Sequence, residues 1–240
     1  MKCLTQMNKF IFDVDGTLTP SRGKMDYNFQ AWFNTFCLTN DVYIVTGSDK
    51  DKTVEQIGKT YDLAKVAYNC SGNDVYSAGV RIRKSDWVTP EEVKKWLSDE
   101  LIRSPYPVRT GNHLEERPGT ANFSVVGRNA NKEQRAQYVE YDTVNNERNE
   151  IVESFNYNFG EKTLGLMATS GGDTGIDLYP IGFDKSQVIL DFPDHDTVHF
   201  FGDKMDPGGN DYPLAQVNKN GVNHHVRNWQ HTWEILKCLQ

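Results

Sequence analysis

The stretch Phe10-Ile-Phe-Asp-Val-Asp-Gly-Thr-Leu-Thr-Pro-Ser-Arg22 carries the strongest structural signal in this chain. Its first three residues are apolar and are typical of the end of a buried strand. Two aspartates follow, Asp13 and Asp15, and then Gly16, where the chain can turn sharply. Because side chains alternate along an extended chain, Asp13 and Asp15 point to the same side. Carboxylates held together in this way repel each other unless a cation or a shared proton relieves them.

This pair of carboxylates suits Mg²⁺ and a phosphate ester. One carboxylate can attack phosphorus, and the other can carry a proton to the leaving oxygen. Oxygen ligands of this kind are also the ones that Mg²⁺ prefers. A surface turn that happens to carry two aspartates is the alternative explanation, and the apolar run before Asp13 counts against it.

A resemblance to a known family begins at these residues. Asp13-Val-Asp-Gly-Thr17 resembles the first motif of the haloacid dehalogenase superfamily of phosphotransferases. The longer stretch through Thr19-Pro-Ser-Arg22 resembles, more narrowly, eukaryotic-type phosphomannomutases. The resemblance implies an α/β fold, with a haloacid-dehalogenase-like Rossmannoid core around a parallel sheet and an inserted α+β cap domain. It also implies a nucleophile at Asp13, a proton carrier at Asp15 and a substrate contact at Arg22.

Composition and charge limit the expected partners. The chain has 240 residues, 38% of them hydrophobic and 25% charged, which is typical of a globular protein with a proper core. A net charge of −7 argues against a nucleic-acid partner, because nucleic-acid phosphates reward clustered Lys and Arg. The stretch Met1–Asn8 has no apolar signal core, and no run has the length of a membrane helix, so no membrane partner is expected.

The cysteines and histidines show no metal-binding spacing. Their wide separation predicts reduced thiols in a cytoplasmic protein rather than a zinc site or a disulfide framework. The cysteines are Cys3, Cys37, Cys70 and Cys238. Three histidines lie close together near the C-terminus, where a solvated surface is the expected explanation: His224, His225 and His231.

A second strand ends in polar residues that belong to the same site. A helical pattern over residues 26–38 and a β-branched run over residues 41–45 follow the first motif. Strand, helix and strand in this order predict a parallel sheet with ligands at the carboxyl ends of its strands. The hydroxyl of Thr46 is our first choice for holding phosphate oxygens, with free backbone N–H groups beside it, and that of Ser48 is the second. Helix N-capping by Ser48 or Asp49 is a compatible alternative.

The sequence pattern changes near residue 80. From there to about residue 184, strands and helices no longer alternate, which predicts an antiparallel α+β unit. We therefore expect a discontinuous core of residues 1–79 and 185–240, a cap of residues 80–184 that sets substrate specificity, and an active site where they meet. One helix start is predicted at Thr89-Pro-Glu-Glu92, with Thr89 as the N-cap and Glu92 closing a capping box.

Three arginines of the cap are candidates for phosphate binding, because Arg can grip phosphate with two N–H groups at once. Taken singly, each is better explained as a solvated surface charge. Together, the stretch Glu-Arg-Pro-Gly-Thr…Val-Val-Gly-Arg-Asn-Ala-Asn-Lys-Glu-Gln-Arg135 resembles the cap of phosphomannomutases. The resemblance implies that Asp177 bonds sugar hydroxyls and that Lys185 compensates the carboxylates and the transferring phosphoryl group. It also implies that the substrate's non-reacting phosphate is held by Arg117, Arg128 and Arg135.

The stretch from Thr197 to Asp211 resembles the fourth motif of the family. Thr197-Val-His-Phe-Phe-Gly-Asp203 reads as another buried strand that ends in Gly-Asp. Asn210 and Asp211 are expected to orient Lys185 or metal-bound water. The resemblance implies three Mg²⁺ ligands: Asp13, the backbone carbonyl of Asp15, and Asp203.

Two positions depart from the family pattern. Gly175 stands where the family has serine, so one sugar or phosphate contact is missing. Thr46 stands where the mutases have glycine and the related phosphatases have threonine. Both departures count against a mutase and leave the prediction of phosphoryl transfer untouched.

These patterns predict a Mg²⁺-dependent phosphomutase that interconverts hexose 6-phosphate and hexose 1-phosphate through an aspartyl-phosphate. The resemblance points to phosphomannomutase and GDP-mannose biosynthesis, with a homodimer through the cap as one option. If water is the second nucleophile, the protein is instead a sugar-phosphate phosphatase; a nucleic-acid 3′-phosphatase fits the acidic charge less well. A non-catalytic sugar-phosphate-binding protein is a further alternative, against which the complete set of carboxylates and lysine argues. Mannose and glucose phosphates both stay open as substrates.

Overall fold

The computed structural model describes residues 7–239, which divide into two compact units. The first unit contains the chain up to residue 84 and from residue 184 onward, and the second contains residues 85–183. The sequence places the first boundary at 79/80 instead; the difference arises because residues 80–84 form a strand of the first unit. Cys3 and most of the Met1–Asn8 stretch lie outside the described residues. No helix within residues 7–239 is long and apolar enough to cross a membrane.

The first unit is built on a seven-stranded sheet. Its strands are β1 (Asn8–Phe12), β2 (Asp41–Val45), β3 (Val66–Asn69), β4 (Asp74–Ser77), β5 (Val80–Lys84), β10 (Thr197–Gly202) and β11 (Val222–His225). They lie in the order β11-β10-β1-β2-β3-β4-β5. The first five of these are parallel, and β4 and β5 are antiparallel additions at one edge. β1 therefore lies inside the sheet with β10 on one side and β2 on the other.

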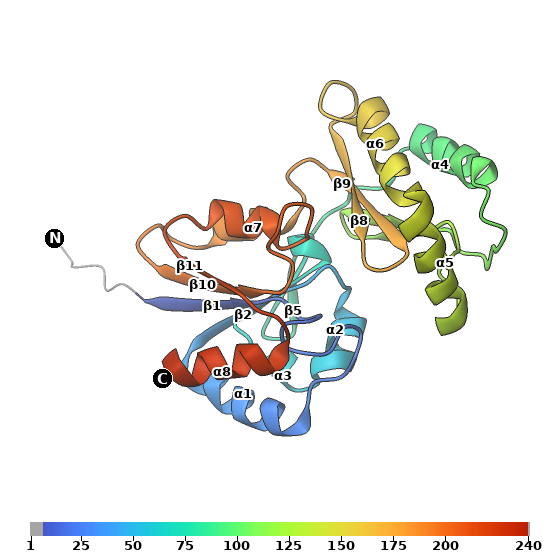
Figure 1. The fold of residues 1–240 in the computed structure, drawn as a ribbon. Helices are drawn as coiled ribbons and strands as arrows, with labels where there is room; N and C mark the ends of the chain where they lie inside the picture. Colours follow the sequence, from blue (N-terminus) through green and yellow to red (C-terminus); the bar gives the residue numbers. More distant parts are fainter. Residues whose placement is uncertain (1–6, 240) are drawn as a thin grey trace. The chain divides into compact units, whose positions relative to one another are not determined.

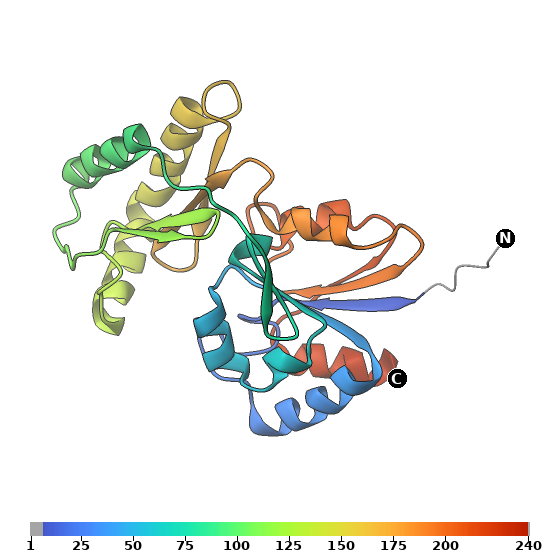
Figure 2. The same cartoon turned by 180° about the vertical axis from the view of Figure 1, so that it is seen from behind.

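Helices cover both faces of this sheet, as Figures 1 and 2 show. Phe10 and Phe12 of β1 pack with Phe33 in the cluster that also includes the C-terminal helix, whereas Ile11 packs with Leu214 on the opposite face. Because both faces are covered, β1 needs an uninterrupted apolar run rather than alternation. The helices are α1 (Tyr27–Thr39), α2 (Lys50–Ile57), α3 (Thr60–Leu63), α7 (Tyr212–Val217), α8 (Trp229–Leu239) and the 3₁₀ segments η1 (Cys70–Gly72) and η2 (Lys185–Asp191).

The second unit is an antiparallel sheet with helices against it. Its strands lie in the order β6-β7-β9-β8. One apolar cluster joins these strands to the helices, with Val93, Tyr138, Phe155 and Ile176 among its buried members. The elements are α4 (Glu91–Arg103), β6 (Leu114–Arg117), β7 (Thr120–Phe123), α5 (Lys132–Asn145), α6 (Glu147–Phe159), β8 (Leu166–Gly171) and β9 (Gly175–Pro180).

The capping box expected at Thr89 is wrong. Helix α4 begins at Glu91 with Pro90 as its N-cap, and no side chain caps it. The hydroxyl of Thr89 instead donates to Oε2 of Glu116 at 3.0 Å, on strand β6. A long-range partner has therefore replaced the local one that the sequence pattern favours. A complete capping box forms at α5, between Asn131 and Gln134.

The expectation of a solvated surface at His224 is also wrong. His224 lies on β11, and its ring stacks on that of Phe201 with 4.1 Å between the ring centroids. Its Nε2 lies 3.2 Å from Nδ1 of His199 on the neighbouring strand β10. Burial, together with the nearby His199, lowers the pKa of His224 to about 4, and burial also lowers the pKa of His199. The parallel register of β10 and β11 creates this pair, which sequence spacing does not reveal.

We expect this histidine pair to make the protein less stable as the pH falls from about 6.5 toward 4. In that window unfolded histidine takes up a proton that folded His224 does not, so the unfolded state binds more protons. Because the pair is partly exposed, the effect should be modest. We expect the free energy of unfolding to fall by about 1 kcal/mol between pH 7 and pH 5, which lowers the Tm by about 2–4 °C. The measurement is thermal unfolding across pH for wild type and His224→Phe. The variant should lose part of the slope, whereas the control His231→Phe should keep it; equal slopes for all three proteins would contradict the prediction.

Candidate active site

The ends of β1 and β10 bring Asp13 and Asp203 together. The main-chain N–H of Asp13 donates to the carbonyl of Phe201 at 2.9 Å, so the pairing of the two strands continues past their regular ends. Asp203 directly follows the last residue of β10. Adjacent parallel strands thus deliver both aspartates to the carboxyl edge of the sheet, where ligands bind in such folds.

A fully buried lysine joins the acidic residues. Nζ of Lys185 lies 2.6 Å from Oδ1 of Asp13 and 2.6 Å from Oδ1 of Asp211, and its side chain has 0% exposure. Burial alone would lower the pKa of Lys185, but the two carboxylates raise it above its usual value. The ammonium group therefore stays charged. Oδ2 of Asp211 also accepts the N–H of Lys204 at 3.0 Å, which fixes that carboxylate, whereas Asn210 is exposed beside it.

The acidic cluster has the composition that a divalent cation requires. Asp13, Asp203 and Asp211 each offer an oxygen, and these oxygens lie within 4.8 Å of one another. Burial raises the pKa of Asp13 well above its usual value; the Lys185 ammonium opposes this, and the charges of Asp211 and Asp203 add to it. Three carboxylates and one ammonium leave two negative charges, which is the charge that Mg²⁺ would neutralise.

Two glycines provide the space that the carboxylates of Asp203 and Asp211 occupy. A Cβ on Gly16 would lie 2.3 Å from Oδ2 of Asp203, and a Cβ on Gly202 would lie 2.6 Å from Oδ2 of Asp211. Gly16 also has a φ of +82°, a backbone conformation that disfavours other residues. The glycine of the first motif therefore serves both the turn and the close approach of Asp203.

The carboxylate of Asp15 is held through one of its two oxygens. Oδ1 accepts the main-chain N–H of Arg22 at 2.5 Å and the Nε2–H of Gln56 at 2.9 Å. Arg22 itself has a φ of +56°, so the chain turns sharply at this donor. Gln56 is absent from the residues that the sequence singles out. The signal that could have found it is a polar residue on the buried face of α2, beside Thr53 and Ile57.

Two backbone donors of the loop after β2 already have partners within the protein. The N–H of Thr46 donates to the carbonyl of Tyr68 at 2.9 Å, and the N–H of Ser48 donates to Oγ1 of Thr46 at 3.1 Å. The expectation that free N–H groups of this loop receive phosphate oxygens is therefore wrong for these two residues. Asp49 caps helix α2 by accepting the N–H of Lys52 at 2.9 Å. Thr46 and Ser48 are both buried at the carboxyl edge of the sheet.

In the second unit, two of the three candidate arginines share one carboxylate. Oε1 of Glu115 lies 3.1 Å from Nη2 of Arg117, and its Oε2 lies 2.5 Å from Nε of Arg128. The carboxylate of Glu115 on β6 thus joins the two arginines. These contacts lower the pKa of Glu115 against the opposing effect of its burial. Arg135 lies 3.9 Å from Asp173 instead. The structure thus brings Arg117 and Arg128 together through Glu115 and pairs Arg135 with Asp173.

A hydrogen bond to Asp177 leaves no space for a side chain at Gly175. Asp177 on β9 accepts the Nδ2–H of Asn122 on β7 at 2.6 Å. A Cβ on Gly175 would lie 2.5 Å from that same Nδ2, and a Cβ on Gly171 would lie 2.2 Å from Oδ2 of Asp177. The small residues at both positions therefore accommodate the bond between Asp177 and Asn122.

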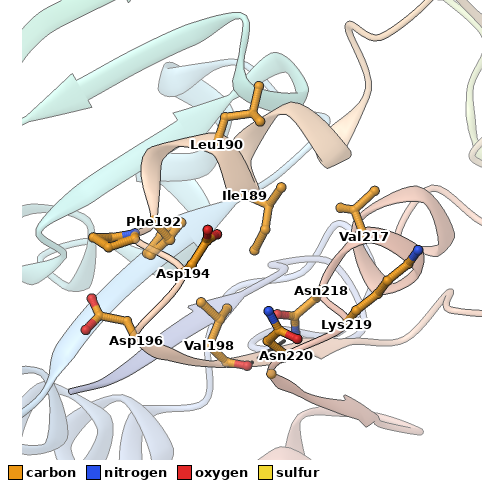
Figure 3. Close-up of a pocket in the computed structure, with 12 residues that line it drawn as sticks. Ile189, Leu190, Phe192, Asp194, Asp196, Val198, Val217, Asn218, Lys219 and Asn220 are labelled. Carbon is orange, nitrogen blue, oxygen red and sulfur yellow. Dashed lines mark hydrogen bonds between the residues drawn. The ribbon is translucent and has the colours of Figure 1, made fainter. Parts of the chain in front are cut away.

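The pocket drawn in Figure 3 is not part of this site. It has a volume of about 250 Å³ and is lined by residues 189–198 of the η2–β10 segment and 217–221 after α7. Asp196 and Val198 place it at the amino end of β10, whereas Asp203 follows the carboxyl end of the same strand. The carboxylates and Lys185 therefore lie at the other edge of the sheet.

The first unit, with carboxylates at the ends of adjacent parallel strands and a buried lysine beside them, has the fold of the haloacid dehalogenase-like proteins. Two solved structures share this fold. A haloacid dehalogenase-like hydrolase of Bacteroides thetaiotaomicron matches with a TM-score of 0.61, 10% identity and coverage of 98% of this chain and 100% of that one. An IMP-nucleotidase of Plasmodium falciparum matches with a TM-score of 0.63, 15% identity and coverage of 97% and 68%.

Sequence comparison then gives the family. The model of the eukaryotic phosphomannomutase family matches residues 29–240. A probable phosphomannomutase of Caenorhabditis elegans is 32% identical, with 95% of each chain covered. Phosphomannomutase 1 of Homo sapiens is 31% identical over 96% of this chain and 90% of its own. The chain belongs to the eukaryotic phosphomannomutase family, as the resemblance of its motifs predicts, and its function is phosphomannomutase-like.

Proposed function

We propose that this enzyme is a Mg²⁺-dependent phosphomutase that interconverts hexose 6-phosphate and hexose 1-phosphate. The observation that carries the proposal is the fully buried ion pair of Lys185 with Asp13 and Asp211. Burying these charges costs free energy unless they pair with one another or with a bound ligand. A cytoplasmic location and a place in GDP-mannose biosynthesis, both implied by the resemblance, are parts of the same proposal.

The proposed reaction takes place at the carboxyl edge of the first unit's sheet. An oxygen of Asp13 forms a bond to phosphorus, the bond from phosphorus to the sugar oxygen breaks, and Asp15 supplies the proton to that oxygen. Asp15 then removes a proton from the incoming hydroxyl, which takes the phosphoryl group from Asp13. Lys185 holds the Asp13 carboxylate in place throughout. Mg²⁺, held by Asp13, Asp203 and the backbone carbonyl of Asp15, would neutralise charge on the phosphoryl oxygens.

The second unit is proposed to bind the part of the substrate that does not react. A mutase must hold a bisphosphate, so it needs a second phosphate site besides the one at Asp13. Arg117 and Arg128, joined by Glu115, have the planar N–H groups that bind phosphate in pairs. Arg135, Arg22 and Ser48 are further proposed substrate contacts, and Asp177 is proposed to bind sugar hydroxyls. A homodimer through this unit belongs to the proposal as well.

A sugar-phosphate phosphatase is the second candidate, and Thr46 favours it. This threonine is 1% exposed at the carboxyl edge of the sheet, at the position where related phosphatases carry threonine. Solved structures with the same fold include a trehalose-6-phosphate phosphatase related protein, with a TM-score of 0.55, 15% identity and coverage of 96% of each chain. In this candidate water takes the phosphoryl group from Asp13, and the first half of the reaction is unchanged.

The test is ³¹P NMR of the purified protein with Mg²⁺, mannose 1-phosphate and a trace of hexose 1,6-bisphosphate. We expect mannose 6-phosphate to appear without inorganic phosphate. The second phosphate site holds the sugar monophosphate so that its hydroxyl, rather than water, takes the phosphoryl group from Asp13, and it retains the resulting bisphosphate until the other phosphoryl group has been returned to Asp13. Chelation of Mg²⁺ should stop the conversion. Glucose 1-phosphate, tested in parallel, shows which epimer is preferred.

Inorganic phosphate as the main product would contradict the mutase and support the phosphatase. Turnover that persists after chelation would contradict the proposed metal site. Binding of the sugar phosphate without any conversion would support the non-catalytic alternative.

A further inference from the structure

We propose that Gln56 is a positioning residue that orients Asp15, so that Oδ2 rather than Oδ1 exchanges protons with the sugar oxygen. This inference rests on the proposed function, in which Asp15 carries the proton. It adds a residue of α2, which no motif of the sequence marks, to the machinery that follows β1.

The hydrogen bonds of Asp15 show how its carboxylate is oriented. Both bonds that the structure gives this carboxylate end on Oδ1, one from Nε2 of Gln56 at 2.9 Å and one from the N–H of Arg22 at 2.5 Å. Two donors on one oxygen fix the plane of the group and occupy the lone pairs of that oxygen. Oδ2 is therefore the oxygen that keeps a lone pair for the proton, in a defined direction.

The amide of Gln56 has a fixed orientation of its own. Its Nε2 faces two acceptors, Oδ1 of Asp15 and, at 3.4 Å, the carbonyl of Gly23. An amide turned the other way would place its oxygen against both acceptors and would gain neither bond. Gln56 is only 5% exposed, so the amide itself is largely shielded from solvent.

The backbone of Gln56 also bonds to the segment that follows Asp15. Its carbonyl accepts the N–H of Met25 at 2.9 Å. Gln56 thus contacts the segment from Asp15 to Met25 through three hydrogen bonds, two from its side chain and one to its backbone. The bond from Asp15 to helix α2 is direct, and the remaining bonds hold the loop that supplies the Arg22 donor.

The test compares substrates that differ in their need for a proton. A sugar leaves phosphorus as an alkoxide unless Asp15 protonates it, whereas p-nitrophenolate leaves without protonation. In Gln56→Met, which keeps the size of the side chain and removes its donors, formation of the aspartyl-phosphate from mannose 1-phosphate should slow by about 10–100-fold. Formation from p-nitrophenyl phosphate should slow by less than about threefold, and KM should change little, because Gln56 acts on the proton transfer rather than on binding.

Two controls separate the outcomes. Asp15→Asn should show the same dependence on the leaving group, more strongly. Gln30→Met loses a comparable amide bond, from Gln30 to the carbonyl of Ile57 at 2.6 Å at the end of α2, without contact to Asp15, and should behave as wild type. If Gln56→Met fails to fold, Gln56→Leu also lacks the donors and brings no charge next to Asp15.

The controls also distinguish failure of the inference from failure of the proposed function. If Asp15→Asn depends on the leaving group but Gln56→Met slows both substrates equally or neither, the inference is overturned and the function stands. If Asp15→Asn shows no such dependence, Asp15 is not the proton carrier, and the proposed function and this inference fall together.

Discussion

Asp13→Asn is expected to abolish turnover. The amide cannot form the acyl phosphate, and enzymes that lose their nucleophile typically lose about 10⁴–10⁶-fold in kcat. Substrate binding should survive, because the other carboxylates and the arginines of the second unit are untouched. Quench-flow and intact-mass measurements should detect no covalent phosphoryl group on the variant, whereas wild type should accumulate it during turnover.

The control for this variant is Asp41→Asn, which makes the same chemical change at the amino end of β2. Asp41 pairs with Lys9 at 2.6 Å, far along the strand from the reacting edge. We expect this control to retain wild-type turnover and to lose only a little stability. Full activity of Asp13→Asn would remove Asp13 from the mechanism, and a phosphorylated variant protein would show that another residue is the nucleophile.

Lys185→Met is expected to destabilise the protein by about 3–5 kcal/mol and to stop catalysis. Removing the ammonium leaves the buried carboxylates of Asp13 and Asp211 facing each other without compensation, and breaking a buried pair in this way has about that cost. At about 2–4 °C per kcal/mol, the Tm should fall by about 6–20 °C. Thermal unfolding at pH 7 without added metal is the direct measurement.

The loss should shrink as the pH falls and as Mg²⁺ is added. Without the ammonium the carboxylates have a raised pKa, so the folded variant binds protons that the unfolded chain releases, and low pH favours the folded state. Mg²⁺ would stabilise it because the cation replaces the missing positive charge. Lys9→Met removes a buried lysine from the partly exposed Asp41 at 2.6 Å and from the more distant Asp196 at 3.7 Å, so it should cost less and leave activity intact. A Tm of Lys185→Met equal to that of wild type would contradict the prediction.

The residues around Asp13 show how much the sequence alone could predict. The apolar run Phe10–Phe12, the turn at Gly16 and the Gly202-Asp203 pair are local patterns, and each produces the element that the pattern predicts. A parallel sheet carries its ligands at the carboxyl ends of its strands, so even the proximity of Asp13 and Asp203 follows from topology. Motif resemblance added Lys185, which the structure places between Asp13 and Asp211.

What the sequence could not predict depends on contacts between distant segments. Gln56 reaches Asp15 across 41 positions, and His199 reaches His224 across 25, with no spacing rule to indicate either pair. Thr89 does not cap helix α4, because its hydroxyl donates instead to Glu116, a residue of strand β6 that lies 27 positions away in the sequence. The strand Val80–Lys84 is exposed throughout, so no buried apolar run in the sequence connects it to the first sheet. Its side-chain link to β4, the ion pair of Arg81 with Asp74 at 2.8 Å, is visible only in the structure.

The position of β1 between β2 and β10 has a consequence for how the chain is made. At about 5–20 residues per second, the ribosome completes β10 at Gly202 on the order of 10–40 s after it adds Asp13. Throughout that time the strand that precedes the proposed nucleophile has an open edge, since its neighbour β10 lies much later in the chain. Residues 85–183 form a continuous unit that can fold in the interval. A truncated messenger RNA that ends after that unit would therefore yield a folded second unit joined to an incomplete sheet. The unpaired edge of β1 in that sheet would be a target for chaperones and for proteolysis.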